Sequence, residues 1–174
     1  MKHDIETPPR TIMEVFQMLP AGTLAEVIDG TLYMSPALNT NHQRTLARIY
    51  AELLKQSIPG EFFISPYDVY LDEKQHALQP DLTFVSSANK AIVKEDAIHG
   101  VPDLVIEILS PGNADHDRIK KKSLYQQFGV KEYWIIDPET KDSIGYSLKG
   151  NTYDECGRFQ GIIHSVLLSV EIHF

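Results

Sequence analysis

The stretch from residue 101 to residue 137 constrains the fold most: VPDLVIEILSPGNADHDRIKKKSLYQQFGVKEYWIID. It holds two short apolar runs, typical of buried strands, on either side of a Pro-Gly break and a charged segment. Asp115 and its neighbours can cap a helix that reaches about Phe128, and Gly129 suits the position just after a helix. A strand, a helix and a second strand in this order predict a right-handed crossover within one sheet.

Glu107 is an acid inside the first apolar run. Strand alternation divides this run into two faces, one with Val105, Glu107 and Leu109 and the other with Leu104, Ile106, Ile108 and Ser110. Two interpretations compete. Alternation can point the carboxylate at solvent, or the carboxylate is buried and needs a partner, because an unpaired buried charge is costly. The run is apolar on both faces, as in a sheet covered on both sides, and this favours a functional carboxylate.

Two other segments offer partners for Glu107. Upstream, residues 79–85 predict a short strand with Asp81 at its mouth, and Pro80 restricts the backbone just before this acid. Downstream, the predicted helix carries three consecutive lysines, Lys120, Lys121 and Lys122. Two carboxylates on neighbouring strands and an ammonium from an adjacent helix predict a divalent-metal site with a cation beside it.

The N-terminal part predicts a short helix and a β-hairpin. Thr11 and Glu14 have the spacing of a capping box, which predicts a helix over residues 12–19. Asp29-Gly30 has the residues of a tight two-residue turn, which predicts a hairpin over residues 24–34.

A longer helix is predicted over residues 39–56. Its apolar side consists of Leu46, Ile49, Tyr50, Leu53 and Leu54. His42 lies in its first turn, where it can cap or pack the helix, or face the hairpin and Glu26. Further strands are predicted at residues 61–65, 67–71, 133–137, 143–148 and 164–168. The expected fold is α/β, a mixed α+β sheet flanked by helices, in a single domain over residues 1–174.

The net charge and the composition limit which binding partners and which cellular compartment we expect. The net charge is −8, whereas a DNA-binding protein usually carries a basic face, because phosphate contacts supply much of the affinity. Nucleic-acid binding would therefore be local, assisted by metal ions or a partner, or absent. No run of eighteen apolar residues and no secretion signal is found, and the single Cys156 excludes an intrachain disulfide. These features predict a cytoplasmic protein that does not span a membrane.

Three stretches resemble a known family. Pro80-Asp81, Glu107 and a nearby lysine are similar to the PD-(D/E)XK nuclease signature. More closely, the chain resembles the Uma2 family of restriction-endonuclease-like bacterial proteins in the segments Glu26 to Gly30 with Ser35-Pro36 and His42, Pro80 to Leu82, and Pro102 to Pro138. The last segment is specific, and the match spans most of the chain. The resemblance implies a restriction-endonuclease-like core.

The sequence departs from the nuclease signature at one position. The signature has lysine two residues after the acid, where this chain has Leu109. The resemblance implies that the lysine has moved to the following helix, and Lys121, four residues before Tyr125, is the position carried over. Lys120 and Lys122 stay open, because adjacent helical residues point about a hundred degrees apart.

The predicted roles follow from the chemistry of hard divalent ions, which take oxygen ligands. Asp81 and Glu107 would bind Mg²⁺ or Mn²⁺, with the Ile108 carbonyl, waters and a phosphate oxygen completing the shell. The ion would activate water and neutralise developing charge, while Lys121 would steady the attacking water or the phosphate. Glu26 is a candidate additional ligand or water-orienting acid.

Asp103 and Asp117 have simpler interpretations, as a strand-entry turn and as a charge at a helix start. The leading hypothesis is metal-dependent hydrolysis of DNA phosphodiester bonds. The alternatives are a catalytically silent nuclease-fold protein that binds nucleic acid or a protein partner, and a hydrolase of a small phosphoester with a narrow, closed pocket. A homodimer is expected, because nuclease folds commonly cut two strands as dimers and residues 166–170 offer an apolar edge to cover.

Overall fold

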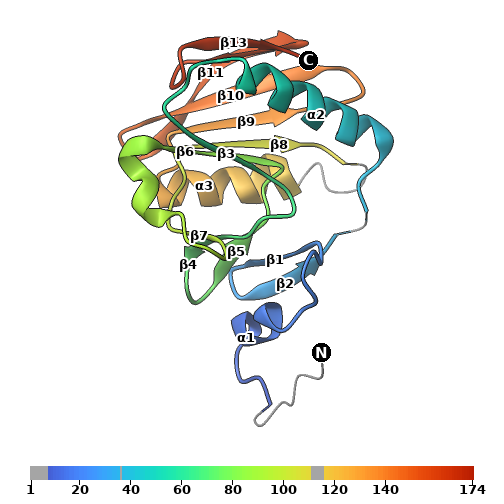
Figure 1. Cartoon of the computed structure of the whole chain (residues 1–174), viewed down its shortest axis with the longest axis vertical. Coiled ribbons are helices and arrows are strands. Elements are labelled where there is room, and N and C mark those ends of the chain that lie inside the picture. The colour runs from blue at the N-terminus through green and yellow to red at the C-terminus, as the bar shows by residue number, and fades with distance from the viewer. Residues whose placement is uncertain (1–7, 36, 111–115) are drawn as a thin grey trace.

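The computed structural model describes residues 8–35, 37–110 and 116–174 (Figure 1). In chain order the elements are α1 (Ile12–Gln17), β1 (Ala25–Ile28), β2 (Thr31–Met34), α2 (Thr40–Leu54), β3 (Gly60–Ile64), β4 (Val69–Asp72), β5 (His76–Leu78), β6 (Leu82–Ser86), the 3₁₀ helix η1 (Ser87–Ile92), β7 (Ile98–His99), β8 (Leu104–Ile108), the π-helix η2 (His116–Lys121), α3 (Lys122–Phe128), β9 (Glu132–Ile136), β10 (Asp142–Lys149), β11 (Thr152–Gln160), β12 (Ile162–Ser165) and β13 (Val170–His173). Among the described residues, every helix is too short or too polar to cross a membrane.

A six-stranded mixed sheet forms the centre of the molecule. Its strand order is β11-β10-β9-β8-β6-β3, and β8 and β9 are its one parallel pair. Parallel neighbours need a crossover, and η2 with α3 supplies it. The predicted strand, helix and strand of residues 101–137 are therefore confirmed, as is the mixed sheet flanked by helices. The predicted cap Asp115 and the Pro111-Gly112 break lie outside the described residues.

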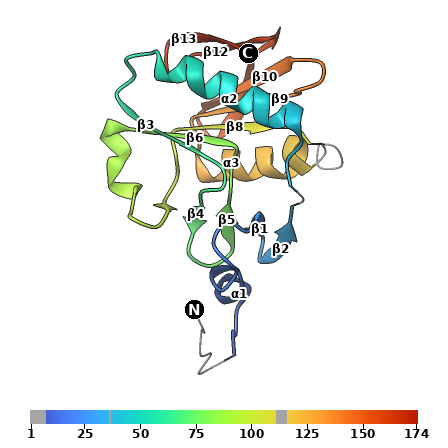
Figure 2. The same ribbon diagram turned by 45° about the vertical axis from the view of Figure 1, so that its right-hand side comes forward.

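Different elements cover the two faces of the central sheet. On one face, α2 and the β12–β13 hairpin bury a core with the even-numbered residues of β8, among them Ile106. On the other face, α3 and a five-stranded sheet of order β2-β1-β5-β4-β7 share a core with Val105 and Tyr133. Figures 1 and 2 show these layers from top to bottom, with α1 packed below the five-stranded sheet. The alternation predicted around Glu107 is thus correct, and both faces are covered.

Local sequence signals in the N-terminal part are confirmed. Thr11 Oγ1 accepts the Glu14 N–H, and the Glu14 carboxylate accepts the Thr11 N–H, which completes the capping box of α1. Asp29 and Gly30 have φ values of 50° and 68°, as the tight turn between β1 and β2 requires. Gly129 has a φ of 89° at the end of α3, also as predicted.

The structure corrects the sequence analysis at one side chain of α2 and at the predicted C-terminal strand. Leu54, assigned to the buried side of the second helix, is 60% exposed, because it points about a hundred degrees away from the fully buried Leu53 and so leaves the face that packs on the sheet. The predicted strand at residues 164–168 ends at Ser165, and a turn leads into β13. The buried carboxylate of Glu132 accepts the Leu167 N–H at 2.7 Å and so fixes this turn. Residues 166–170 are therefore not a continuous apolar edge strand.

Candidate metal-binding site

The two predicted acids lie at the same end of the central sheet. β6 and β8 are antiparallel with Leu82 opposite Ile106, so Asp81, just before β6, and Glu107, just after Ile106 in β8, lie at the same end of this strand pair. Their side chains have different neighbours, because Asp81 contacts His42 of α2 and Glu107 contacts Tyr125 of α3. The site therefore begins as two carboxylates at one end of the sheet.

Asp81 is held through one of its two carboxylate oxygens. The Ile108 N–H donates to Oδ2 at 2.7 Å, and His42 Nε2 lies 3.0 Å from the same oxygen. Pro80, just before Asp81, has no N–H to donate to a neighbouring strand.

Glu107 is anchored by the crossover segment. Tyr125 in α3 donates its hydroxyl to Glu107 Oε1 at 2.8 Å, and Lys121 Nζ lies 3.1 Å from the same oxygen. Burial, together with the charge of Glu107, raises the pKa of Tyr125 well above its ordinary value. The tyrosine hydroxyl therefore stays a donor to the carboxylate across the physiological pH range.

Glu26 reaches the site from the second sheet. Its Oε1 lies 2.8 Å from Lys121 Nζ and accepts the Gln79 N–H at 3.1 Å. Lys121 thus lies between Glu26 of β1 and Glu107 of β8. The exposed fractions are 7% for Glu26, 7% for Asp81, 3% for Glu107 and 5% for Lys121. Glu26, Glu107 and Lys121 therefore form one buried cluster joined by ion pairs, and Asp81 is buried beside His42 and Ile108. The catalytic roles of all four stay predictions.

The three consecutive lysines have different neighbours. Lys120 Nζ donates to the Tyr33 hydroxyl at 3.0 Å, and Lys122 Nζ lies 3.9 Å from the centre of the Tyr146 ring. Lys121 contacts the acids. Successive residues on a helical segment point in different directions, so one lysine of the three reaches Glu26 and Glu107. It is Lys121, the lysine that the resemblance carried over.

The chemistry of the cluster fits a small divalent ion. Among the described residues, no group of three or more His, Cys, Asp or Glu side chains converges as a ready-made metal cage. Mg²⁺, however, typically takes one or two carboxylates and completes its shell with water and phosphate oxygens. Asp81 Oδ1 accepts no hydrogen bond from the described residues, since both donors to this side chain bind Oδ2. The oxygen atoms of Asp81, Glu107 and the Ile108 carbonyl are of the type that Mg²⁺ or Mn²⁺ binds, and a metal site made of them stays a prediction.

Sequence reasoning missed the actual position of His42. Neither the hairpin nor Glu26 is its partner; the imidazole contacts Asp81. Its backbone N–H donates to the N-cap residue Asn39, so part of the predicted capping role is correct. A signal was available: His42 falls in helical register with Leu46, Ile49 and Leu53, which places it on the buried side of α2.

Asp103 has the structural role that its sequence position suggests. Its carboxylate accepts the Ser86 N–H at 2.8 Å, an Asn89 amide hydrogen and the Lys131 ammonium at 2.6 Å. These contacts join β6, η1 and β9 at the start of β8. The side chain of Asp117, the other acid with a simpler interpretation, lies outside the described part of the chain.

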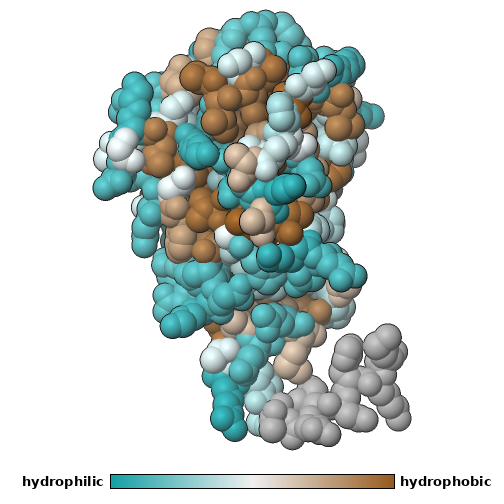
Figure 3. Space-filling model, turned by 60° about the vertical axis from the view of Figure 1, so that its left-hand side comes forward, coloured by the Kyte–Doolittle hydropathy of each residue, from teal (hydrophilic) through white to brown (hydrophobic). Residues whose placement is uncertain are grey.

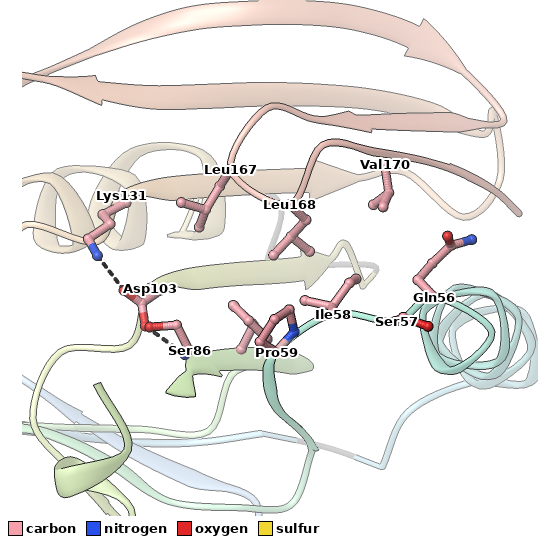
Figure 4. A pocket seen from close by; sticks show the side chains of 11 residues that line it. Gln56, Ser57, Ile58, Pro59, Ser86, Asp103, Lys131, Leu167, Leu168 and Val170 are labelled. Atoms are coloured by element: carbon pink, nitrogen blue, oxygen red, sulfur yellow. Dashed lines mark hydrogen bonds and ion pairs between the residues drawn. The ribbon is translucent and has the colours of Figure 1, made fainter. Parts of the chain in front are cut away.

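A cavity of about 480 Å³ lies near Asp103, away from the acid cluster. Figure 4 shows Leu168 and Val170 above it, Ile58 and Pro59 below it, and the Asp103–Lys131 ion pair at one end. In Figure 3 hydrophobic surface gathers in the upper part of the molecule, where α2 and the β12–β13 hairpin lie. None of the four predicted site residues lines this cavity.

Comparisons with known proteins agree with the sequence resemblance. The family model described as "Uma2: Putative restriction endonuclease" matches residues 13–169. Among solved structures, the chain is similar to that of "a putative nuclease belonging to DUF820" from Anabaena variabilis, with a TM-score of 0.64 and 19% identity over 84% of each chain. At this identity the likeness shows the fold, and it confirms the predicted fold class. A search of curated proteins gave no match.

Proposed function

We propose that this chain, which belongs to the Uma2 family, is a divalent-metal-dependent nuclease that hydrolyses phosphodiester bonds of DNA. The observation that carries the proposal is the position of Lys121. Its ammonium lies 2.8 Å from Glu26 and 3.1 Å from Glu107, at the end of the β6–β8 strand pair where Asp81 also lies. Carboxylates with a lysine beside them are groups that metal-assisted phosphoryl chemistry uses.

Each residue of the cluster has a distinct part in this proposal. Asp81, Glu107 and the Ile108 carbonyl would hold Mg²⁺ or Mn²⁺, which when bound supplies Lewis-acid stabilisation and an acidified water. Lys121 directs its positive charge at the scissile phosphate, where negative charge develops during attack. Glu26 orients the Lys121 side chain through its 2.8 Å contact and is not itself required as a ligand.

A second candidate is a metal-dependent hydrolase of small phosphoesters. The low exposure of Asp81, Glu107, Glu26 and Lys121 favours it, since buried groups are easier to reach for a small substrate than for a duplex. The net charge of −8 points in the same direction, because it weakens long-range attraction to DNA. The family supports the nuclease, so DNA remains the leading substrate. The cytoplasmic location and the homodimer stay predictions.

The test is cleavage of supercoiled and linear DNA by the purified protein with Mg²⁺ or Mn²⁺. Asp81→Asn, Glu107→Gln and Lys121→Met should each lower the rate at least about a hundred-fold, because each removes a metal ligand or the charge at the phosphate. Lys120→Met and Lys122→Met are matched controls, since their side chains contact Tyr33 and Tyr146 and no acid of the site.

The substrate is decided by running bis(p-nitrophenyl) phosphate beside DNA. Cleavage of this small diester alone, sensitive to the same three substitutions, would support the second candidate against the nuclease. A wild-type protein that cuts neither substrate and binds no divalent ion in calorimetry would overturn both.

A further inference from the structure

His42 is a buried side chain whose role the proposed reaction does not explain. It is 1% exposed and lies in the first turn of α2, next to Asp81. Nε2 is 3.0 Å from Asp81 Oδ2, whereas Nδ1 is buried without a hydrogen-bond partner in the part of the chain that the structure describes. A buried polar atom without a partner costs free energy, and packing alone could be served by an apolar residue. The position of His42 therefore points to a role at Asp81.

The contact fixes the chemistry of the imidazole. A carboxylate accepts hydrogen bonds and donates none, so the proton of the interaction is on Nε2. Asn39 caps the helix at the His42 N–H, which fixes the backbone from which the ring extends. The ring therefore approaches Asp81 from a defined direction as a hydrogen-bond donor.

The same contact determines how Asp81 presents its oxygens. His42 and the Ile108 N–H both bind Oδ2, so two donors from different elements hold one oxygen. Oδ1 receives no hydrogen bond from the described residues. Two donors on one oxygen stop the carboxylate from rotating, and the other oxygen keeps its lone pairs for a cation.

We propose that His42 is a positioning residue that orients Asp81 so that Oδ1 can bind a divalent ion. The inference rests on the proposed metal site and adds a residue to it. Hydrogen-bond partners of metal-binding carboxylates typically change metal affinity 10- to 100-fold when they are removed. A rigid, planar donor suits this task, because it fixes an angle as well as a distance.

The test compares Mn²⁺ binding by calorimetry in wild type, His42→Phe, His42→Gln and His42→Asn, each as the full chain and without DNA. His42→Phe keeps a planar ring and removes the donor, so affinity should fall about 10- to 100-fold. In His42→Gln the amide nitrogen reaches roughly the position of Nε2, and affinity should return to within about threefold of wild type. In His42→Asn the amide stops near the position of Nδ1, so affinity should stay low.

Thermal unfolding of the metal-free proteins separates positioning from a structural role. His42→Phe should melt close to the wild-type temperature, because the lost Nε2 bond to Asp81 is offset by removal of the buried Nδ1 without a partner. A large drop in melting temperature with unchanged Mn²⁺ affinity would overturn the inference in favour of packing. If the phenylalanine variant does not fold, the glutamine and asparagine variants carry the comparison, and equal affinities in these two would overturn the inference as well.

The outcomes distinguish this inference from the proposed function. Wild-type DNA cleavage with equal Mn²⁺ affinity in wild type and His42→Phe keeps the nuclease and rejects the positioning role. Absence of cleavage together with the predicted affinity series rejects the nuclease and keeps the positioning role. A wild-type protein that binds no Mn²⁺ overturns the metal site and the role of His42 with it.

Discussion

Asp103 and Asp81 are buried aspartates at equivalent positions in the sheet, but the hydrogen-bond donors are distributed differently over their carboxylate oxygens. Each directly precedes a strand, β8 for Asp103 and β6 for Asp81, and these strands are antiparallel neighbours. The two acids therefore lie at opposite ends of the pair. At Asp103 both oxygens are bonded, Oδ2 by Ser86 and Asn89 and Oδ1 by Lys131. At Asp81 both donors share Oδ2, and the described residues leave Oδ1 without a donor.

Both carboxylate oxygens of Asp103 have hydrogen-bond donors within the chain. Burial alone would raise the pKa of its carboxyl, but the hydrogen bonds from Lys131, Ser86 and Asn89 lower it below the ordinary value. The charged form of Asp103 therefore stabilises the folded chain. Asp81 has two donors among the described residues, both on Oδ2, so the proposed cation would bind its other oxygen. Both acids are buried, and they differ in how many of their oxygens have donors.

The largest expected effect is that Asp103→Asn lowers stability and keeps metal affinity, whereas Asp81→Asn keeps stability and lowers metal affinity. Asp103→Asn should lower the free energy of unfolding by about 2 to 3 kcal/mol, because three charge-assisted contacts are lost or weakened, and should keep Mn²⁺ affinity within about twofold. Asp81→Asn should change stability by less than about 1 kcal/mol and lower Mn²⁺ affinity at least about a hundred-fold. Urea unfolding and calorimetry on the same preparations measure both. Loss of metal binding in Asp103→Asn with little loss of stability would reverse the assignment of the two acids.

A smaller effect is expected in the pH dependence of stability. The folded-state pKa of Asp103 is lowered from 3.8, so its contribution to stability is present above this value and is lost as the pH falls toward the folded-state pKa. The difference in unfolding free energy between wild type and Asp103→Asn should therefore be largest near neutral pH and shrink below about pH 4. Urea unfolding at several pH values measures this difference. A difference that does not change with pH would show that the charge of Asp103 is not what stabilises the fold.

The smallest effect is expected for the lysine partner of Asp103. The Lys131 side chain is 60% exposed, so solvent screens the ion pair despite its distance of 2.6 Å. Lys131→Met should cost at most about 1 kcal/mol, and the loss should shrink at high salt. Urea unfolding at low and high ionic strength checks both points. A loss as large as that of Asp103→Asn would mean that Lys131, and not the backbone of Ser86, is the main partner of Asp103.

Features that depend on neighbours in the sequence were predicted correctly. The capping box of Thr11 and Glu14, the turn at Asp29-Gly30 and the left-handed Gly129 all form within a few residues of chain. The alternation around Glu107 gave both faces of β8 correctly, because both are covered by other elements. The failures include Leu54, the strands β5, β7 and β11, which were not predicted, and the strand at residues 164–168. At residues 164–168 the long-range contact of Glu132 with Leu167 overrides the local pattern.

For the candidate site, residue types in the sequence singled out the acids and the group of lysines as candidates, since carboxylates and a nearby cation stand out from an apolar background. Tertiary structure decided which groups meet. It brought Lys121, among three adjacent lysines, between Glu26 and Glu107 from two sheets and placed the His42 ring at Asp81. These contacts link residues 14 to 95 positions apart along the chain. Their geometry depends on the register of strands and the rotation of helices, which local sequence preferences do not specify.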